Sequence, residues 1–148
     1  MVEIVLYQPE IAGNVGAIIR LAANSGVSLN LVKPFGFDLQ ENKIRRAGLD
    51  YHDLSNTKTY NSWEEFTEIN INKSICCLSS KGKDSYWDTN LNHYDFLLFG
   101  PESIGLPNEI ISSYKTITIP MKENSRSINL ANSVGIVVFE SLRQASVQ

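Results

Sequence analysis

Short apolar segments alternate with amphipathic ones along the whole chain. Apolar and β-branched residues fill the segments 2–7, 28–33, 74–79, 94–99 and 116–119. Such nearly continuous apolar runs are typical of strands buried on both faces of a parallel sheet. Helical spacing follows in residues 15–24, 63–69 and 108–113. The alternation predicts an α/β fold with a mostly parallel open sheet and helices on both faces.

Capping signals define several of these helices. Asn14 is a suitable N-cap for a helix over Val15–Asn24, and Gly26 is placed to end it. Ser62 and Glu65 have the capping-box spacing at the start of the next helix. The first strand, helix and second strand therefore form a β-α-β unit, whose crossover makes its strands parallel.

The segment 117–144 organises the C-terminal part of the chain. A short β-rich run ends at Pro120, a polar loop follows, and a helix begins. The first turn of this helix is polar and contains Ser127, Asn129, Asn132 and Ser133. Beyond it the helix is apolar on more than one side. Ala131 and Gly135 would let a second helix, including one from another subunit, approach closely; an ordinary buried terminal helix is the alternative.

Composition indicates one compact domain over residues 1–148. The chain has 43% hydrophobic residues, and we place no domain boundary in it. Its apolar runs are too short to span a membrane, and the first residues lack a basic signal-peptide start. We therefore expect a cytoplasmic protein without membrane partners.

The cysteines and histidines indicate no metal site. Cys76 and Cys77 are adjacent in a predicted strand, where neighbouring side chains point to opposite faces, so we interpret them as structural thiols. His52 and His93 are far apart and have no second ligand at metal-binding spacing.

The net charge of −3 argues against binding nucleic acid by bulk electrostatics. A local basic cluster, Lys43, Arg45 and Arg46, lies in a predicted short helix over residues 41–47. Such a cluster is either a solvated helix face or an RNA-binding face. Residues 50–54 are either irregular or an edge strand.

Glycine, asparagine and serine gather where the predicted strands end. The segments concerned are 9–16, 79–82, 100–105 and 120–129. Each alone is typical of a turn, but the carboxyl ends of parallel strands are where ligands bind in open α/β sheets. Gly100 and Gly105, on either side of Glu102, would let backbone groups approach a ligand closely. The phosphate-loop and dinucleotide-binding glycine patterns are both missing, which disfavours nucleotide hydrolysis and nicotinamide chemistry.

Several motifs along the chain resemble those of a known family. They are Pro-Glu-Ile with Asn-x-Gly and Ile-Ile-Arg over 9–20, Arg-Ala-Gly-Leu-Asp-Tyr over 46–51, Phe-Gly-Pro-Glu-Ser-x-Gly-Leu-Pro over 99–107, Ile-Pro-Met over 119–121 and Ser-Arg-Ser-x-Asn-Leu over 125–130. In this order, they resemble the SPOUT methyltransferases. Within that class, the chain is most similar to the small tRNA (cytidine/uridine wobble) 2′-O-methyltransferases. The resemblance covers nearly the whole length of the chain, with no appended RNA-binding domain.

The resemblance implies a C-terminal deep trefoil knot, S-adenosylmethionine as methyl donor without a metal, a homodimer, and the tRNA anticodon stem-loop as substrate. The positions that match the family's donor contacts are Leu78, Gly100, Ile119 and Ser127. The positions that match its catalytic motif residues are Asn14, Arg20, Glu102, Ser127 and Asn129. Lys43, Arg45 and Arg46 are the candidate RNA contacts.

Methyl transfer to a ribose hydroxyl requires an in-line arrangement and the removal of a proton. Neither histidine lies in a motif. Because a guanidinium is almost never deprotonated, we interpret Arg20 as a phosphate clamp that stabilises the developing alkoxide. The alternatives are an exposed helix arginine for Arg20 and a turn or capping residue for Glu102.

The chain departs from the family pattern at two places. It has Ala12-Gly13 where the family often has Pro-Pro, which should loosen that loop, and Phe139 where the family often has Tyr. Any role that the tyrosine hydroxyl has in the family is therefore not carried over to Phe139. Methylation at another tRNA or rRNA position, and a non-catalytic module that binds RNA or the donor, are the alternative functions.

Overall fold

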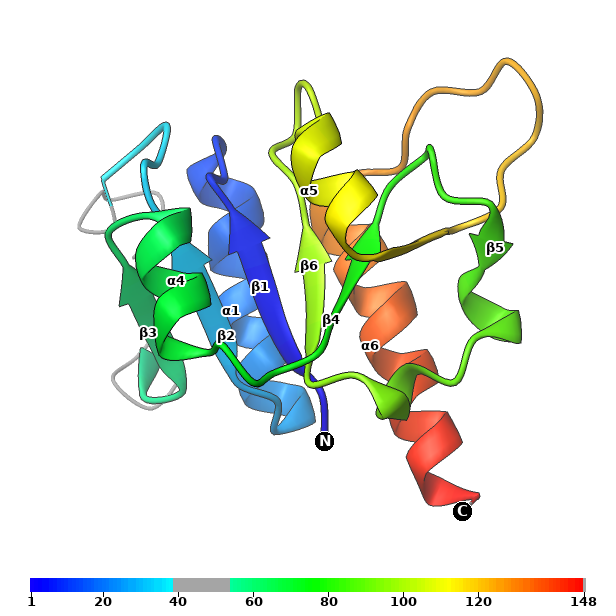
Figure 1. Cartoon of the computed structure of the whole chain (residues 1–148), viewed down its shortest axis with the longest axis horizontal. Helices are drawn as coiled ribbons and strands as arrows, with labels where there is room; N and C mark the ends of the chain where they lie inside the picture. The colour runs from blue at the N-terminus through cyan, green and yellow to red at the C-terminus, as the bar shows by residue number, and fades with distance from the viewer. Residues whose placement is uncertain (39–53, 148) are drawn as a thin grey trace.

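A seven-stranded parallel sheet with helices on both faces forms the protein, in a computed structural model that describes residues 1–38 and 54–147 (Figure 1). The strand order is β3-β2-β1-β6-β4-β7-β5, and every neighbouring pair is parallel. The predicted fold class is confirmed. The short helix predicted over residues 41–47, with Lys43, Arg45 and Arg46, lies outside the described residues, as does most of the segment 50–54.

All five predicted strands are present, with bounds shifted by one or two residues. The strands are β1 Glu3–Tyr7, β2 Leu29–Val32, β3 Thr57–Tyr60, β4 Ile75–Leu78, β5 Asp84–Ser85, β6 Phe96–Phe99 and β7 Lys115–Thr118. The sequence did not predict β3 and β5. They are the two edge strands of the sheet, and edge strands need no continuous apolar run: Lys58 and Thr59 in β3 are exposed.

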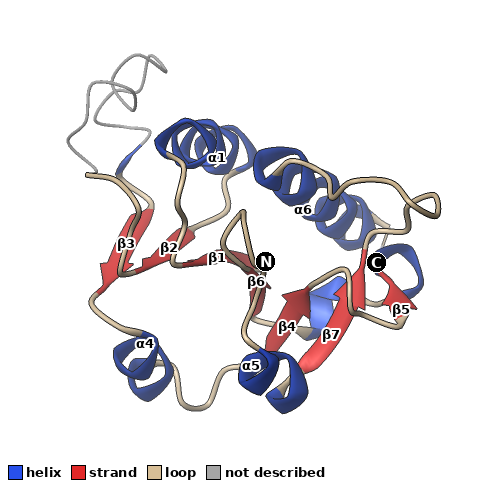
Figure 2. Cartoon of the chain, turned by 90° about the horizontal axis from the view of Figure 1, so that it is seen from above, coloured by secondary structure: helices blue, strands red, loops and turns tan. Residues whose placement is uncertain are grey.

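The helices form one layer on each side of the sheet. They are α1 Ala12–Ser25, α4 Trp63–Ile69, α5 Asn108–Ser113 and α6 Leu130–Ser146, with 3₁₀ turns η1 Tyr86–Asp88 and η2 Leu91–His93. Figure 2, seen from above, places α1 and α6 over one face of the sheet and α4 and α5 over the other. None of the helices within the described residues is long and apolar enough to cross a membrane.

Alternate residues of each strand contribute to two separate apolar cores. Ile4 and Leu6 belong to the core under α1 and α6, whereas Val5 between them belongs to the core under α4 and α5. Cys76 and Cys77 divide in the same way, both buried and both as free thiols. The prediction of structural thiols on opposite faces is confirmed.

The close helix approach expected at Gly135 occurs within the chain. Helix α6 packs beside α1 (Figure 2). A Cβ at Gly135 would lie 3.2 Å from Cδ1 of Leu21 in α1, closer than most side-chain contacts. The small residue therefore brings the first and last helices of one chain together.

The predicted start of α1 is wrong, whereas the other caps are confirmed. Helix α1 begins at Ala12, three residues before the predicted Val15, and its N-cap Ile11 has no side-chain capping bond. Gly26 ends the helix with a left-handed φ of 76°. Ser62 caps α4, since its Oγ accepts from Glu65 N–H at 3.0 Å. Residues 12–13 are thus a helical turn instead of a loosened loop.

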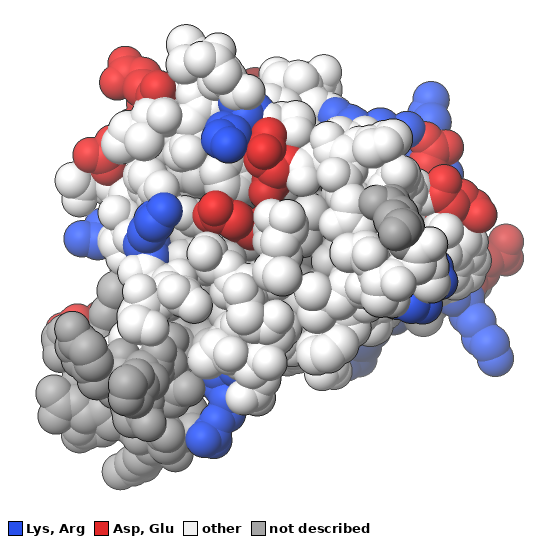
Figure 3. Space-filling model, turned by 90° about the horizontal axis from the view of Figure 1, so that it is seen from below, with Lys and Arg blue, Asp and Glu red and all other residues white. Residues whose placement is uncertain are grey.

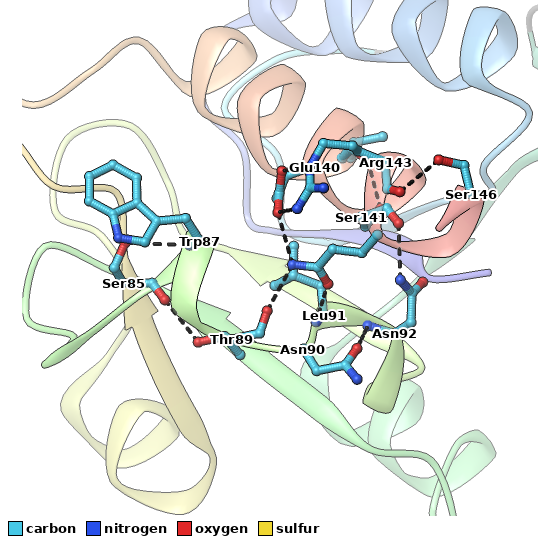
Figure 4. A network of polar contacts seen from close by, with 12 residues as sticks. Ser85, Trp87, Thr89, Asn90, Leu91, Asn92, Glu140, Ser141, Arg143 and Ser146 are labelled. Atoms are coloured by element: carbon cyan, nitrogen blue, oxygen red, sulfur yellow. Dashed lines mark hydrogen bonds and ion pairs between the residues drawn. The ribbon is translucent and has the colours of Figure 1, made fainter. Parts of the chain in front are cut away.

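Polar contacts fix the C-terminal half of α6 against the 3₁₀ turns (Figure 4). Leu91 N–H donates to Oε1 of Gln144, and Nε2 of Gln144 donates to the carbonyl oxygen of Thr89, both at 2.9 Å. The Asn92 amide donates to the Ser141 carbonyl oxygen at 3.0 Å. These bonds hold the C-terminal half of α6 against the segment that precedes β6.

Candidate functional site

A cleft of about 420 Å³ opens at the carboxyl ends of β1, β6, β4 and β7. These are four consecutive strands in the sheet order, and the residues that follow each of them line the cleft. The four glycine-, asparagine- and serine-rich segments of the sequence therefore meet at one place. This confirms the prediction that they form one site.

Most of the predicted site residues lie in this cleft. The lining includes Asn14, Leu78, Gly100, Glu102, Ile119, Ser127 and Asn129. Arg20 is the exception: it is exposed on α1 and does not line the cleft. Six residues of helix separate it from Asn14, about 9 Å along the axis and about 240° around it. Arg20 therefore lies on another side of α1 from Asn14 and outside the lining of the cleft.

Glu102 ties the loop after β6 to the beginning of α1. Its Oε1 accepts from Glu10 N–H at 2.9 Å, and its Oε2 accepts from Ile11 N–H at 2.7 Å. These two N–H groups belong to Ile11, the N-cap of α1, and to Glu10 before it, so the carboxylate fixes the backbone that leads into the helix. Glu102 therefore has a structural contact with the approach to α1, from a loop 91 residues away, and its role in catalysis stays a prediction.

A second glutamate makes the reverse connection. Oε1 of Glu10 accepts from the backbone N–H of Ser103 at 3.1 Å and from its hydroxyl at 2.6 Å. These hydrogen bonds lower the pKa of Glu10, the side-chain bond most. Glu10 and Glu102 together clasp the two loops that form one side of the cleft.

Two side-chain amides and a carboxylate that line the cleft are joined by hydrogen bonds. Nδ2 of Asn14 donates to Oε2 of Glu102 at 3.3 Å, and Nδ2 of Asn129 donates to Oδ1 of Asn14 at 3.0 Å. Oδ1 of Asn129 accepts from Asn132 N–H at 3.2 Å and so caps α6. Asn14 is therefore not a helix cap: its side chain links Glu102 to Asn129.

Glycines allow the loops to approach the backbone of other segments. A Cβ at Gly100 would lie 2.4 Å from the Leu106 nitrogen, and Gly105 has a left-handed φ of 68°. The loop after β6 can fold back on itself only with glycine at these positions. A Cβ at Gly82, beyond β4, would lie 2.4 Å from the Ile117 carbonyl carbon in β7.

Lys81 is a cleft residue that lies in the predicted strand-end segment 79–82 but was given no role of its own from the sequence. It lines the cleft, and its ammonium group donates to Oδ1 of Asn108 at 2.8 Å. Among the described lining residues, Lys81 is the only cation and Glu102 the only carboxylate. The one available signal was the position of Lys81 directly after a strand end.

The cleft suits an organic ligand with polar groups. Its volume is within the range of small-molecule sites, and its wall combines apolar side chains such as Leu78 and Ile119 with hydroxyl, amide and backbone groups. Within residues 1–38 and 54–147, no group of three or more His, Cys, Asp or Glu side chains could hold a metal ion.

Known structures define the class of protein to which this fold and cleft belong. The fold superposes with a TM-score of 0.93 on a structure described as giving insights into the 2′-OH methylation of C/U34 on tRNA, with 40% identity over 100% of this chain and 98% of the other. An AdoMet-bound rRNA methyltransferase from Sinorhizobium meliloti matches with a TM-score of 0.84 and 25% identity, over 96% of this chain and 56% of the other. The fold is that of RNA methyltransferases.

Sequence comparison identifies the family. Residues 1–139 match the SpoU rRNA Methylase family. Proteins called tRNA (cytidine(34)-2′-O)-methyltransferase are 46% identical in Aeromonas hydrophila and 41% identical in Escherichia coli K12, each over 97% of this chain and 94% of the relative. The chain belongs to the SpoU methylase family, which confirms the predicted resemblance.

Proposed function

We propose that this protein transfers the methyl group of S-adenosylmethionine to the ribose 2′-hydroxyl of the wobble nucleotide, position 34, of tRNA. Relatives that share 46% and 41% of its residues over nearly their whole length bear this activity in their names. The observation that carries the proposal is the cleft itself. Four strand-end segments from distant parts of the sequence meet there, and side chains of three of them, 9–16, 100–105 and 120–129, are hydrogen-bonded to one another.

Leu78, Gly100, Ile119 and Ser127 are the residues that would hold the methyl donor. All four line the cleft, and they offer apolar surface, backbone groups and one hydroxyl. When bound, S-adenosylmethionine supplies a methyl group already activated by a sulfonium sulfur. The chain must therefore orient the ribose hydroxyl opposite that sulfur and exclude competing water.

Asn14, Asn129 and Ser127 are the groups placed to orient the reacting ribose. All three side chains line the cleft, and the amides of Asn14 and Asn129 are fixed by bonds to Glu102 and to the start of α6. Fixed dipoles stabilise charge that develops on an oxygen without reorganising during the reaction. Glu102 acts through Asn14 and through the start of α1, as a positioning residue.

The protein is further proposed to act as a cytoplasmic homodimer, with a deep trefoil knot, on the anticodon stem-loop. Ile136 and Phe139, one helical turn apart on α6, are 37% and 54% exposed, which supports pairing through this helix face. A second subunit would also give Arg20 a route to a cleft, because Arg20 does not line the cleft of its own chain. The candidate RNA contacts Lys43, Arg45 and Arg46 keep their proposed role.

The test is to incubate the purified protein with labelled S-adenosylmethionine and total tRNA and to map the label. We expect 2′-O-methylation at position 34. Label at another tRNA or rRNA position would replace this substrate with the alternative one, and donor binding without transfer to any RNA would indicate a non-catalytic module.

Arg20→Ala should keep donor affinity and lose most turnover; unchanged turnover would make Arg20 an ordinary exposed helix residue.

A further inference from the structure

Lys81 carries a positive charge in the cleft that no carboxylate of the described residues balances. Among the described residues, Lys73, Lys115 and Arg143 form ion pairs with carboxylates, whereas Lys81 forms none. Its only recorded side-chain partner is the neutral amide oxygen of Asn108. An ammonium group has three donors, so the bond to Asn108 positions the group and leaves donors for a ligand.

The charge balance of the cleft favours an anionic ligand group at this position. The only carboxylate of the described lining, Glu102, is directed at the backbone of Glu10 and Ile11 by its hydrogen bonds. The positive charge of Lys81 is therefore not balanced within the cleft. On the opposite edge of the molecule, seen from below in Figure 3, basic and acidic side chains of the described residues are interspersed.

On the basis of the proposed function, we propose that Lys81 binds a backbone phosphate of the RNA strand beside the target ribose. Two anionic groups could reach the cleft: an RNA phosphate and the carboxylate of the methyl donor. The donor has two positive groups and one negative group, so a cation gains less from it than from an RNA strand. Lys81 is also exposed, in contrast to Leu78, which is buried at the end of β4. Its location suits a macromolecule that approaches from solvent.

The loop around Lys81 keeps this contact in register. Lys81 N–H donates to Oγ of Ser79 at 3.1 Å, and Gly82 N–H donates to the Ser79 carbonyl oxygen at 3.0 Å. Gly82 in turn lies against the backbone of Ile117. The Lys81 backbone is therefore fixed between β4 and β7, so that a phosphate contact there would set the position of the RNA relative to the donor site.

The experiment compares tRNA binding at several salt concentrations for the wild-type chain, Lys81→Gln, Lys81→Arg and Lys83→Ala. Lys81→Gln keeps an amide donor for Asn108 and removes the charge. Lys83 is the matched control, because it is exposed two residues away and does not line the cleft. Between about 50 and about 200 mM salt, the wild-type protein should lose about threefold more affinity than Lys81→Gln, the effect of one phosphate contact.

Lys81→Arg and Lys83→Ala should retain the wild-type salt dependence, and donor affinity measured by calorimetry should be the same in all four proteins. Melting temperatures establish that each variant is folded. An unchanged salt dependence in Lys81→Gln would refute the proposal. Weaker donor binding with unchanged tRNA binding would also refute it and assign Lys81 to the donor carboxylate. Failure of the wild-type protein to methylate tRNA would instead contradict the proposed function.

Discussion

Asn14 and Asn129 are 115 residues apart in the sequence, and their side-chain amides are joined by a hydrogen bond of 3.0 Å. The orientation of both amides follows from their other partners. Asn129 must turn its oxygen toward Asn132 N–H, and Asn14 must turn its NH₂ toward the Glu102 carboxylate. The first turns of α1 and α6 are thereby joined across the cleft.

Asn129→Asp should separate the capping role of this residue from its role in the cleft. Aspartate can still cap α6, but it places a carboxylate oxygen against Oδ1 of Asn14. If the Asn14 amide flipped to avoid this repulsion, its Oδ1 would face the Glu102 carboxylate instead. We expect thermal stability close to wild type and turnover reduced about tenfold or more. Asn129→Ala should lose about 1 kcal/mol of stability as well, because the cap is gone. Equal turnover in Asn129→Asp and wild type would exclude a role for the amide chain.

Glu102→Gln should lower both stability and turnover. The NH₂ group of glutamine would face the N–H groups of Glu10 or Ile11, leaving donors without an acceptor at the start of α1. The expected loss is about 1–3 kcal/mol in the free energy of unfolding, measured by denaturant titration. Glu68→Gln, at an exposed position of α4, is the control and should change little. Full stability with lost turnover would indicate that Glu102 is itself the proton acceptor.

Gly82→Ala should destabilise the fold, because the new methyl group would overlap the backbone of Ile117. Backbone atoms cannot give way as a flexible side chain does, so we expect a loss of about 1–3 kcal/mol or more. Gly13→Ala is the contrasting variant. It lies in α1 with no atom within 4 Å of the added Cβ, and should gain about 0.5–1 kcal/mol. Similar unfolding curves for the two variants would contradict this view of Gly82.

The two cysteines should be inert in the native protein. Burial is the main cause that raises the pKa of Cys76 and Cys77 to about 12. At pH 8 only about one thiol in ten thousand would be ionised, so a disulfide reagent should react only after denaturant is added. The raised pKa values of the two thiols also make the stability of the fold depend on pH. The unfolded thiols lose their protons near pH 9, the folded ones only near pH 12, so stability should fall as pH rises between these values. Rapid reaction of the native protein with the disulfide reagent would contradict the prediction that both thiols are buried and inert.

Phe139→Lys should convert the proposed dimer into a monomer. A charged side chain at the exposed α6 position would have to be desolvated at the subunit contact. Ile69→Lys changes an apolar side chain that is 65% exposed on α4, far from α6 on the other side of the sheet, and should leave the assembly unchanged (Figure 2). Sedimentation velocity distinguishes the outcomes. Unchanged assembly in Phe139→Lys would place the interface elsewhere.

The sequence predicted those parts of the fold whose pattern is local. Ser62 and Gly26 cap their helices as expected, because each acts within a few residues of its own position. Asn14 was misassigned because its partners, Glu102 and Asn129, come from distant segments, and nothing nearby distinguishes an amide that caps a helix from one that spans a cleft. The edge strand β3 was missed because its polar residues face solvent.

The candidate site also combines features with a local pattern and features that depend on distant segments. The strand-end rule located the cleft, and the family resemblance supplied most of its residues. Two facts required three-dimensional placement. Arg20 shares a motif with Asn14 but lies on another side of α1, and Lys81 belongs to an ordinary turn yet faces the cleft. Side-chain direction on a helix and the meeting of separate loops depend on packing that no single segment determines.

Because the last lining residues of the cleft belong to the first turn of α6, the site is among the last parts of the molecule to be completed during synthesis. A ribosome-bound chain that ends before residue 127 has the loops after β1, β4 and β6 but neither Ser127 nor Asn129. Such a nascent chain would have only part of the methyl-donor site. The enzyme would therefore become competent only after its C-terminal helix has left the ribosomal tunnel and docked beside α1.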